Sequence, residues 1–146
     1  AFFFSEQTRV VPDPSEKSAT ASPTVESLED LPECSSLIDD EDRSDCYEDA
    51  AAISGRLVEQ LSETILSFED GSAGRMAFLE MQQAWEKSRD VDCAFVQDQT
   101  SSTVIGEIER NSCLVDRNLT RLDQLAVYLC SDEDSTSCEA AVQPIP

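Results

Sequence analysis

The stretch AISGRLVEQLSETILSFEDGS, residues 52–72, determines the fold class that the sequence predicts. Its large apolar residues recur at steps of four and three, at Ile53, Leu57, Leu61, Ile65 and Phe68. This spacing places them on one face of a helix. At its end, Gly71 suits a left-handed position that closes a helix, and Ser72 suits the N-cap of the next one. A connection this short folds the second helix back antiparallel to the first.

Two later stretches show the same helical spacing. In the first, we expect an apolar stripe at Ala77, Met81, Ala84, Ser88, Val91 and Phe95, which Phe78 and Trp85 widen. The polar sequence QDQTSST at residues 97–103 interrupts the pattern, and Thr103 suits the N-cap of a third helix. That helix is marked by Ile108, Val115, Leu119, Leu122, Ala126 and Leu129. Because no convincing alternating strand pattern occurs, the sequence predicts an all-α, antiparallel bundle of three long helices, preceded by a short helix or turn.

Proline placement indicates the limits of the helical region. Prolines precede Cys34 and close the C-terminus, and none lies between, where each would cost a helix interior about 3 kcal/mol. Residues 1–33 are rich in Ser, Thr, Glu and Pro, so they cannot bury enough apolar surface to offset their ordering entropy. The sequence therefore predicts a disordered acidic arm over residues 1–33, a helical domain over residues 34–130 and a C-terminal tail over residues 131–146.

Six cysteines indicate an oxidising compartment. They are Cys34, Cys46, Cys93, Cys113, Cys130 and Cys138. An even number in a short chain favours disulfides, and no pair has the C-x-x-C spacing typical of zinc or redox sites. Helix geometry favours sequential pairing, because Cys93 and Cys113 lie on either side of the break between two antiparallel helices. Cys34 would then pair with Cys46, and Cys130 with Cys138 in the tail. We expect a periplasmic or extracellular protein, either soluble or lipid-anchored.

The charge and the composition exclude several classes of binding partner and of catalytic site. The chain has 146 residues, with ten Lys or Arg, thirty-one Asp or Glu and no His, which makes a formal net charge of −21. Binding to nucleic acid or to an anionic membrane requires clustered cations, so we expect neither, and no apolar run is long enough to span a bilayer. The absence of His removes His-based triads and His zinc sites. Without a glycine-rich phosphate loop or a nucleophile elbow, we expect no enzyme activity, no cofactor and no metal.

The segment QAWEKSRDVDC at residues 83–93 carries a family resemblance. It resembles the AQ-x-AW-x-x-YRD-x-x-C segment of the lysozyme-inhibitor LprI-like family, a group of bacterial envelope proteins. The family pattern continues with a cysteine, an arginine eight residues later and a leucine four beyond that. The matching positions are Trp85, Arg89, Asp90, Cys93, Cys113, Arg121 and Leu125. Ser88 replaces the family tyrosine, and Asn118 replaces a threonine. The resemblance covers about residues 34–126 and implies mainly structural roles for these positions.

The residues themselves favour the same roles. On an amphipathic helix, Trp85 is more often a core residue than a ligand platform. Partly buried arginines normally need partners, so we expect Arg89 and Arg121 to pair with Asp90, Asp92 or Asp116, or to cap carbonyl groups. A basic binding spot formed by the two arginines is the alternative.

The resemblance implies an inhibitor of lysozyme, and the charge agrees with a cationic partner. Animal-type lysozymes are strongly cationic and would be attracted to a surface of this charge. The densest acidic stretch within the helical region is residues 33–49. From it we predict the partner-binding residues Asp39, Asp40, Glu41, Asp42 and Asp45. We do not expect a calcium site there, because the stretch lacks the alternating ligands and central glycine of an EF-hand. The alternative is a noncatalytic envelope structural or interaction domain whose acidity reflects a saline habitat.

Overall fold

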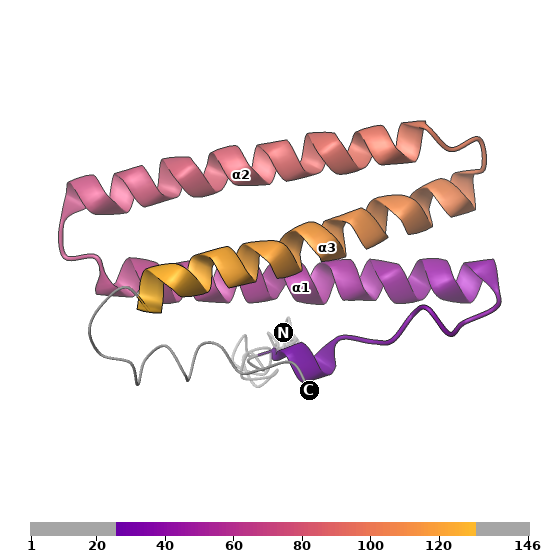
Figure 1. Cartoon of the computed structure of the whole chain (residues 1–146), viewed down its shortest axis with the longest axis horizontal. Coiled ribbons are helices and arrows are strands. Elements are labelled where there is room, and N and C mark those ends of the chain that lie inside the picture. Colours follow the sequence, from indigo (N-terminus) through magenta and orange to yellow (C-terminus); the bar gives the residue numbers. More distant parts are fainter. Residues whose placement is uncertain (1–25, 131–146) are drawn as a thin grey trace, which may run out of the picture.

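Three long helices follow one another in residues 26–130, the part of the chain that the computed structural model describes (Figure 1). A short 3₁₀ turn, η2 (Leu28–Asp30), precedes α1 (Asp40–Phe68), α2 (Ser72–Asp98) and α3 (Thr103–Cys130). No strand occurs in this range, so the predicted all-α bundle is confirmed. Most of the predicted arm and the whole C-terminal tail lie outside the described residues. None of the helices in residues 26–130 has the length and apolar character needed to cross a membrane.

The third helix is the central element of the bundle. α1 and α3 run in the same direction and α2 runs opposite to both, as the two short connections require (Figure 1). α3 packs most extensively against α1 and also against α2, whereas α1 and α2 make few direct contacts. The first two helices are therefore held together mainly through the third.

The connection between α1 and α2 differs from the prediction. Gly71 does not close α1 in a left-handed conformation; it is the N-cap of α2, with an extended backbone at φ −102°, and Ser72 is the first helical residue. Glu69, the residue that follows the last helical residue of α1, has an extended backbone. The N–H of Glu69 donates back to the carbonyl of Leu66. The guanidinium of Arg75 donates to the same carbonyl at 2.5 Å, so a side chain from α2 satisfies the end of α1.

The start of α3 also differs from the prediction by one residue. Thr103 is the first residue of α3 and not its cap. The carbonyl of Ser102 accepts the N–H of Gly106 at 2.8 Å, which makes Ser102 the flanking residue. Both errors are small, and neither changes the number or direction of the helices.

The apolar core contains side chains from all three helices. Val58 and Ile65 of α1, Phe78 of α2 and Leu125 of α3 form its buried centre. Partly buried residues surround them: Leu61, Leu66, Met81, Trp85, Leu122 and Leu129. Full burial of one such side chain contributes about 1.5–3 kcal/mol. Along the predicted stripe of α1, Leu57 and Ile65 are buried and Ile53 and Leu61 are half-buried, whereas Phe68 at the helix end is 64 % exposed.

The predicted apolar face of α2 is correct only in part: Phe78 lies in the core and Met81 and Trp85 pack against it, but the other positions do not. Ala77, Ala84 and Ser88 are exposed, and Val91 and Phe95 are 62 % and 63 % exposed. The buried face instead carries Phe78, Gln82 and Cys93, with Trp85 and Arg89 half-buried between them. Apolar spacing placed part of the stripe on the exposed side because two positions on the buried side, Gln82 and Arg89, are polar and find partners there.

Two disulfides join the bundle. Cys34 bonds to Cys46 and ties the segment before α1 to that helix, and Cys93 bonds to Cys113 and joins α2 to α3. Sequential pairing predicts both bonds. By closing loops of 12 and 20 residues, each contributes on the order of 3 kcal/mol. The predicted third pair includes Cys138, which lies outside the described residues, so that pair stays a prediction.

Candidate protein-binding site

Trp85 brings together the arginines that the motif contains. The guanidinium carbon of Arg89 lies 5.0 Å from the centre of the Trp85 ring, and that of Arg121 lies 5.2 Å from it. Arg89 follows Trp85 by one turn on α2, whereas Arg121 comes from α3. Because an indole ring attracts cations to its π face, this contact helps to hold α2 against α3. The half-buried Trp85 packs against the core, as the sequence favoured.

Arg121 is buried against amides. Its side chain is only 7 % exposed, and its Nε and Nη2 donate to Gln82 Oε1 at 3.1 and 3.0 Å. Its Nη1 donates to Gln124 Oε1 at 3.2 Å. It forms no ion pair with a carboxylate among the described residues, so the expected pairing with an aspartate is wrong here. Burial lowers the pKa of Arg121 because desolvation disfavours its charged form.

Arg89 and Asn118 begin a chain of hydrogen bonds through the three helices. Arg89 contacts the carboxylate of Asp90 at 2.9 Å, as the sequence predicts, and its Nη1 donates to Asn118 Oδ1 at 3.0 Å. Asn118 is 2 % exposed, and its Nδ2 donates to Ser54 Oγ on α1 at 3.0 Å. The amide of one α3 residue therefore connects α2 with α1.

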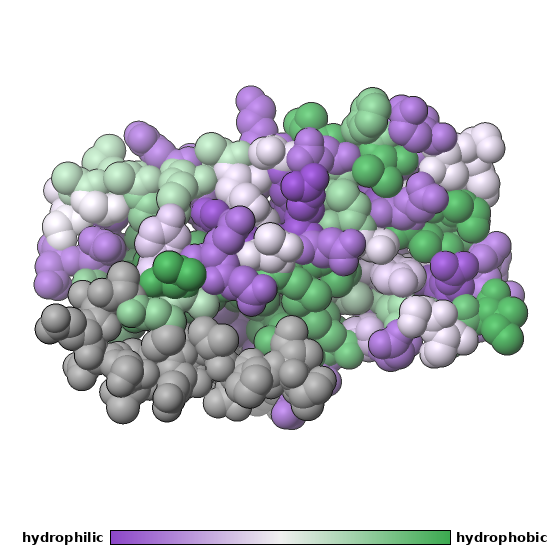
Figure 2. All heavy atoms as spheres, in the orientation of Figure 1, coloured by the Kyte–Doolittle hydropathy of each residue, from purple (hydrophilic) through white to green (hydrophobic). Residues whose placement is uncertain are grey.

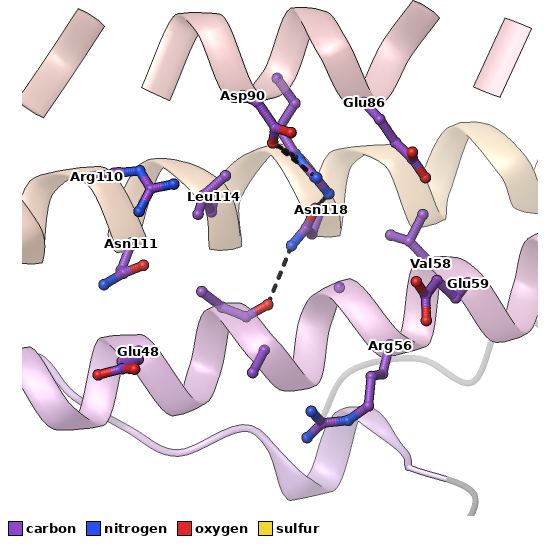
Figure 3. A pocket seen from close by; sticks show the side chains of 14 residues that line it. Glu48, Arg56, Val58, Glu59, Glu86, Asp90, Arg110, Asn111, Leu114 and Asn118 are labelled. Carbon is purple, nitrogen blue, oxygen red and sulfur yellow. Dashed lines mark hydrogen bonds and ion pairs between the residues drawn. The ribbon is translucent and has the colours of Figure 1, made fainter. Parts of the chain in front are cut away.

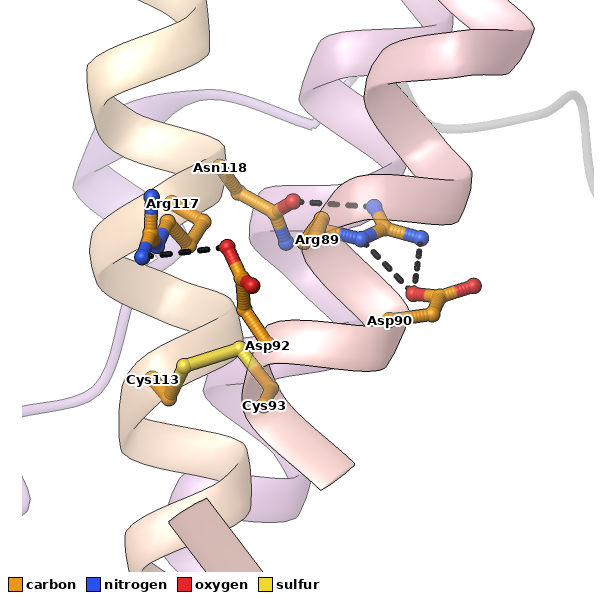
Figure 4. The surroundings of a disulfide bond; sticks show 7 residues. All are labelled: Arg89, Asp90, Asp92, Cys93, Cys113, Arg117 and Asn118. Atoms are coloured by element: carbon orange, nitrogen blue, oxygen red, sulfur yellow. Dashed lines mark hydrogen bonds and ion pairs between the residues drawn. A yellow bond between two sulfur atoms is a disulfide. The ribbon is translucent and has the colours of Figure 1, made fainter. Parts of the chain in front are cut away.

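The Cys93–Cys113 disulfide lies beside this network (Figure 4). One helical turn along α3 from Cys113, Arg117 pairs with Asp92 of α2 at 3.3 Å. Asp92 is thus engaged by Arg117 and by neither arginine of the motif. The disulfide, the ion pair and the Arg89–Asn118 bond together fix the position of α2 on α3.

The predicted partner-binding residues lie on the first turns of α1. Asp39, Asp40, Glu41, Asp42 and Asp45 are all exposed. Asp39 is the N-cap, and its carboxylate accepts the N–H groups of Glu41 and Asp42 at 3.0 and 3.1 Å. Asp40 pairs with Arg43 at 3.5 Å. Carboxylates at a helix N-terminus are worth about 0.3–1 kcal/mol each, so part of this cluster stabilises the helix. No group in the described residues has the ligands to hold a metal.

A groove of about 460 Å³ separates α1 from α2 and has α3 as its floor (Figure 3). Its α1 wall includes three small residues, Ala51, Ala52 and Gly55, which leave room between the helices. A Cβ atom at Gly55 would lie 3.7 Å from Asn118 Nδ2, an ordinary van der Waals contact. The groove therefore lies directly over the hydrogen-bond network that connects the helices.

The two ends of the groove differ in charge. Glu59 and Val58 of α1 and Glu86 of α2 lie at one end, and Glu48, Arg110 and Asn111 lie at the other (Figure 3). Glu48, Glu59 and Glu86 form no ion pair within residues 26–130. Of the lining cations, Arg56 is held by Glu26 at 2.6 Å and Arg89 by Asp90.

The sequence did not indicate this groove or the polar residues beneath it. Gln82 and Asn118 occur at positions that share a helix face with core residues, four residues after Phe78 and seven before Leu125. That placement is the signal that could have identified them. On the visible face of the bundle, apolar and polar residues alternate without one dominating (Figure 2), so hydropathy alone singles out no binding surface.

One comparison with known proteins finds a match. A family model described as lysozyme inhibitor LprI matches residues 34–125. No curated protein and no solved structure matches the chain. The matched region includes both described disulfides, the Trp85 motif and the whole lining of the groove.

Proposed function

Because the chain belongs to the LprI lysozyme inhibitor family, we propose that it is an exported, noncatalytic protein-binding domain that inhibits a cationic lysozyme. The family match over residues 34–125 is the observation that carries this proposal. The disulfides Cys34–Cys46 and Cys93–Cys113 support an oxidising location such as the periplasm or the cell exterior.

Charge supports a cationic target. A chain of net charge −21 attracts a cationic lysozyme over a distance of about 10 Å at moderate salt, which accelerates encounter. The exposed carboxylates on the first turns of α1 and those along the groove both contribute to this field. Screening by salt should therefore slow association.

The proposed mode of inhibition is steric. The catalytic groups of lysozyme are carboxylates, and an acidic surface inserted among them would be repelled. The acidic surface of this chain would instead bind cationic side chains beside the substrate cleft and obstruct it. A disulfide-bonded bundle suits this role, because a rigid binder loses little conformational entropy on association.

A lysozyme turnover assay with excess protein, at low and at physiological salt, tests the proposal. We expect inhibition at both salts and faster onset at low salt. The competing function is a noncatalytic envelope domain that stabilises other components, its acidity reflecting a saline habitat. Full lysozyme activity at both salts would favour that function and contradict the inhibitor.

A further inference from the structure

The acidic end of the groove combines one apolar wall residue, Val58, with two carboxylates that form no ion pair within residues 26–130. We propose that this end, formed by Val58, Glu59 and Glu86, receives a lysine or arginine side chain of the protein partner. The inference rests on the proposed function in one respect, that the partner is a cationic protein. It assigns the contact to the groove and not to the acidic first turns of α1.

The shape of the groove suits a long cationic side chain. Lys and Arg place an aliphatic stem on apolar surface and keep the charged group near water. Ala52, Gly55 and Val58 of α1 line the groove between its larger polar residues, and Leu114 of α3 lines it toward the Arg110 end (Figure 3). A stem placed along the α1 wall would bring its cation to Glu59 and Glu86 at the rim.

The charges at this end are available for a partner. Glu59 and Glu86 come from different helices and form no ion pair within residues 26–130. The nearby cations are already engaged: Arg56 makes a two-point contact with Glu26 at 2.6 and 2.7 Å, and Arg89 contacts Asp90 and Asn118. Arg110 lies at the opposite end (Figure 3). Glu59 still lies within the electrostatic field of Arg56, but the ion pair of Arg56 is with Glu26, so an incoming cation would meet two carboxylates that no arginine contacts directly.

The same charges argue against a second copy of this chain as the occupant. Two chains that each carry −21 repel one another, and the approach of another acidic surface would bring further carboxylates to Glu59 and Glu86. A cationic partner removes this repulsion. Because α1 and α2 are fixed on α3, the groove can accept the side chain without a rearrangement of the helices.

A pair of matched double variants tests the inference. Glu59→Gln with Glu86→Gln removes the two groove charges, whereas Glu63→Gln with Glu80→Gln removes two exposed charges from the same two helices outside the groove. Both variants have the same net charge, so long-range attraction is equal. Binding of each full-length protein to a cationic animal-type lysozyme is measured by surface plasmon resonance. We expect the groove variant to dissociate about tenfold faster than wild type and the control to retain the wild-type dissociation rate.

A third variant closes the groove without changing its charge. Ala52→Leu places a larger side chain on an exposed wall position and should also weaken binding about tenfold, with an unchanged thermal unfolding temperature. Equal effects of the groove and control pairs, or full affinity of Ala52→Leu, would overturn the inference while the proposed function stands. No binding of lysozyme by the wild-type protein would overturn both.

Discussion

Arg89 Nη1 on α2 lies 3.0 Å from Asn118 Oδ1 on α3, and the other side of the same amide donates to Ser54 on α1. One buried side chain therefore has partners on both neighbouring helices. Because α1 and α2 make few contacts of their own, this amide has an uncommonly large share in fixing their relative position. It also supports the floor of the groove.

Removing that amide should destabilise the bundle. Asn118→Ala leaves the buried Ser54 hydroxyl without its donor and Arg89 without one acceptor, so we expect a loss of about 2–3 kcal/mol in the free energy of unfolding. The matched control is Asn111→Ala, two turns earlier on α3. The Asn111 side chain makes no hydrogen bond within residues 26–130, so this change should alter stability by less than about 0.5 kcal/mol. Urea denaturation measures both. Equal stabilities of the two variants would contradict the role of Asn118.

Substitutions at Arg121 test whether a buried charge stabilises the bundle. Its partner Gln82 would be left without hydrogen bonds if Arg121 were replaced by an apolar residue. Gln82 accepts two hydrogen bonds from Arg121 through Oε1, while its buried Nε2 has no partner. Arg121→Met should cost about 1–3 kcal/mol, since Gln82 then loses both bonds. In the double variant Arg121→Met, Gln82→Met, the buried charge and the stranded amide are both replaced by apolar groups, and we expect most of the wild-type stability to return. A double variant no more stable than Arg121→Met alone would contradict this expectation, because the Gln82 amide would then cost nothing after Arg121 is removed.

The orientation of α2 can be tested with one kind of substitution at two sites. Phe78 is buried in the core, whereas Phe95 is 63 % exposed. Phe78→Ala should reduce the free energy of unfolding by about 3–5 kcal/mol, because it leaves a cavity. Phe95→Ala should change it by less than about 0.5 kcal/mol. A larger loss at Phe95 than at Phe78 in chemical denaturation would reverse this assignment of the faces.

The acidic first turns of α1 should act on the rate of association. Asp40→Asn, Glu41→Gln and Asp42→Asn together remove three exposed charges, while Asp39 is retained because it caps the helix. We expect slower association with a cationic lysozyme at low salt and little change in dissociation. Stopped-flow mixing at several salt concentrations measures this effect. An unchanged association rate at low salt would remove these residues from the encounter surface.

The helices could be predicted from the sequence, but the surfaces they bury could be predicted only in part. Spacing identified three helices and both described disulfides because these depend on residues near one another in the chain. The face of α2 depends on tertiary partners, since Gln82 and Arg89 lie on the buried side only because Arg121, Trp85 and Asn118 meet them there. Apolar spacing correctly included Phe78, Met81 and Trp85 but extended the stripe to the exposed Val91 and Phe95.

The candidate site could not be predicted from the sequence, for a related reason. A groove over α3 arises only once α1 and α2 are both placed on that helix, and its small wall residues, such as Ala52 and Gly55, give no signal of their own. The acidic cluster at Asp39–Asp42 was evident from the sequence, but its partial use in capping α1 was not. Charge density therefore indicated a type of partner more reliably than a place of contact.

The most direct test of the account is a titration of a cationic animal-type lysozyme with the full-length protein at physiological salt, followed by its turnover of bacterial cell walls. If the protein inhibits this lysozyme, activity falls in proportion to added protein and reaches a minimum near one equivalent. Undiminished activity in the presence of excess protein, at both physiological and low salt, would contradict the central claim.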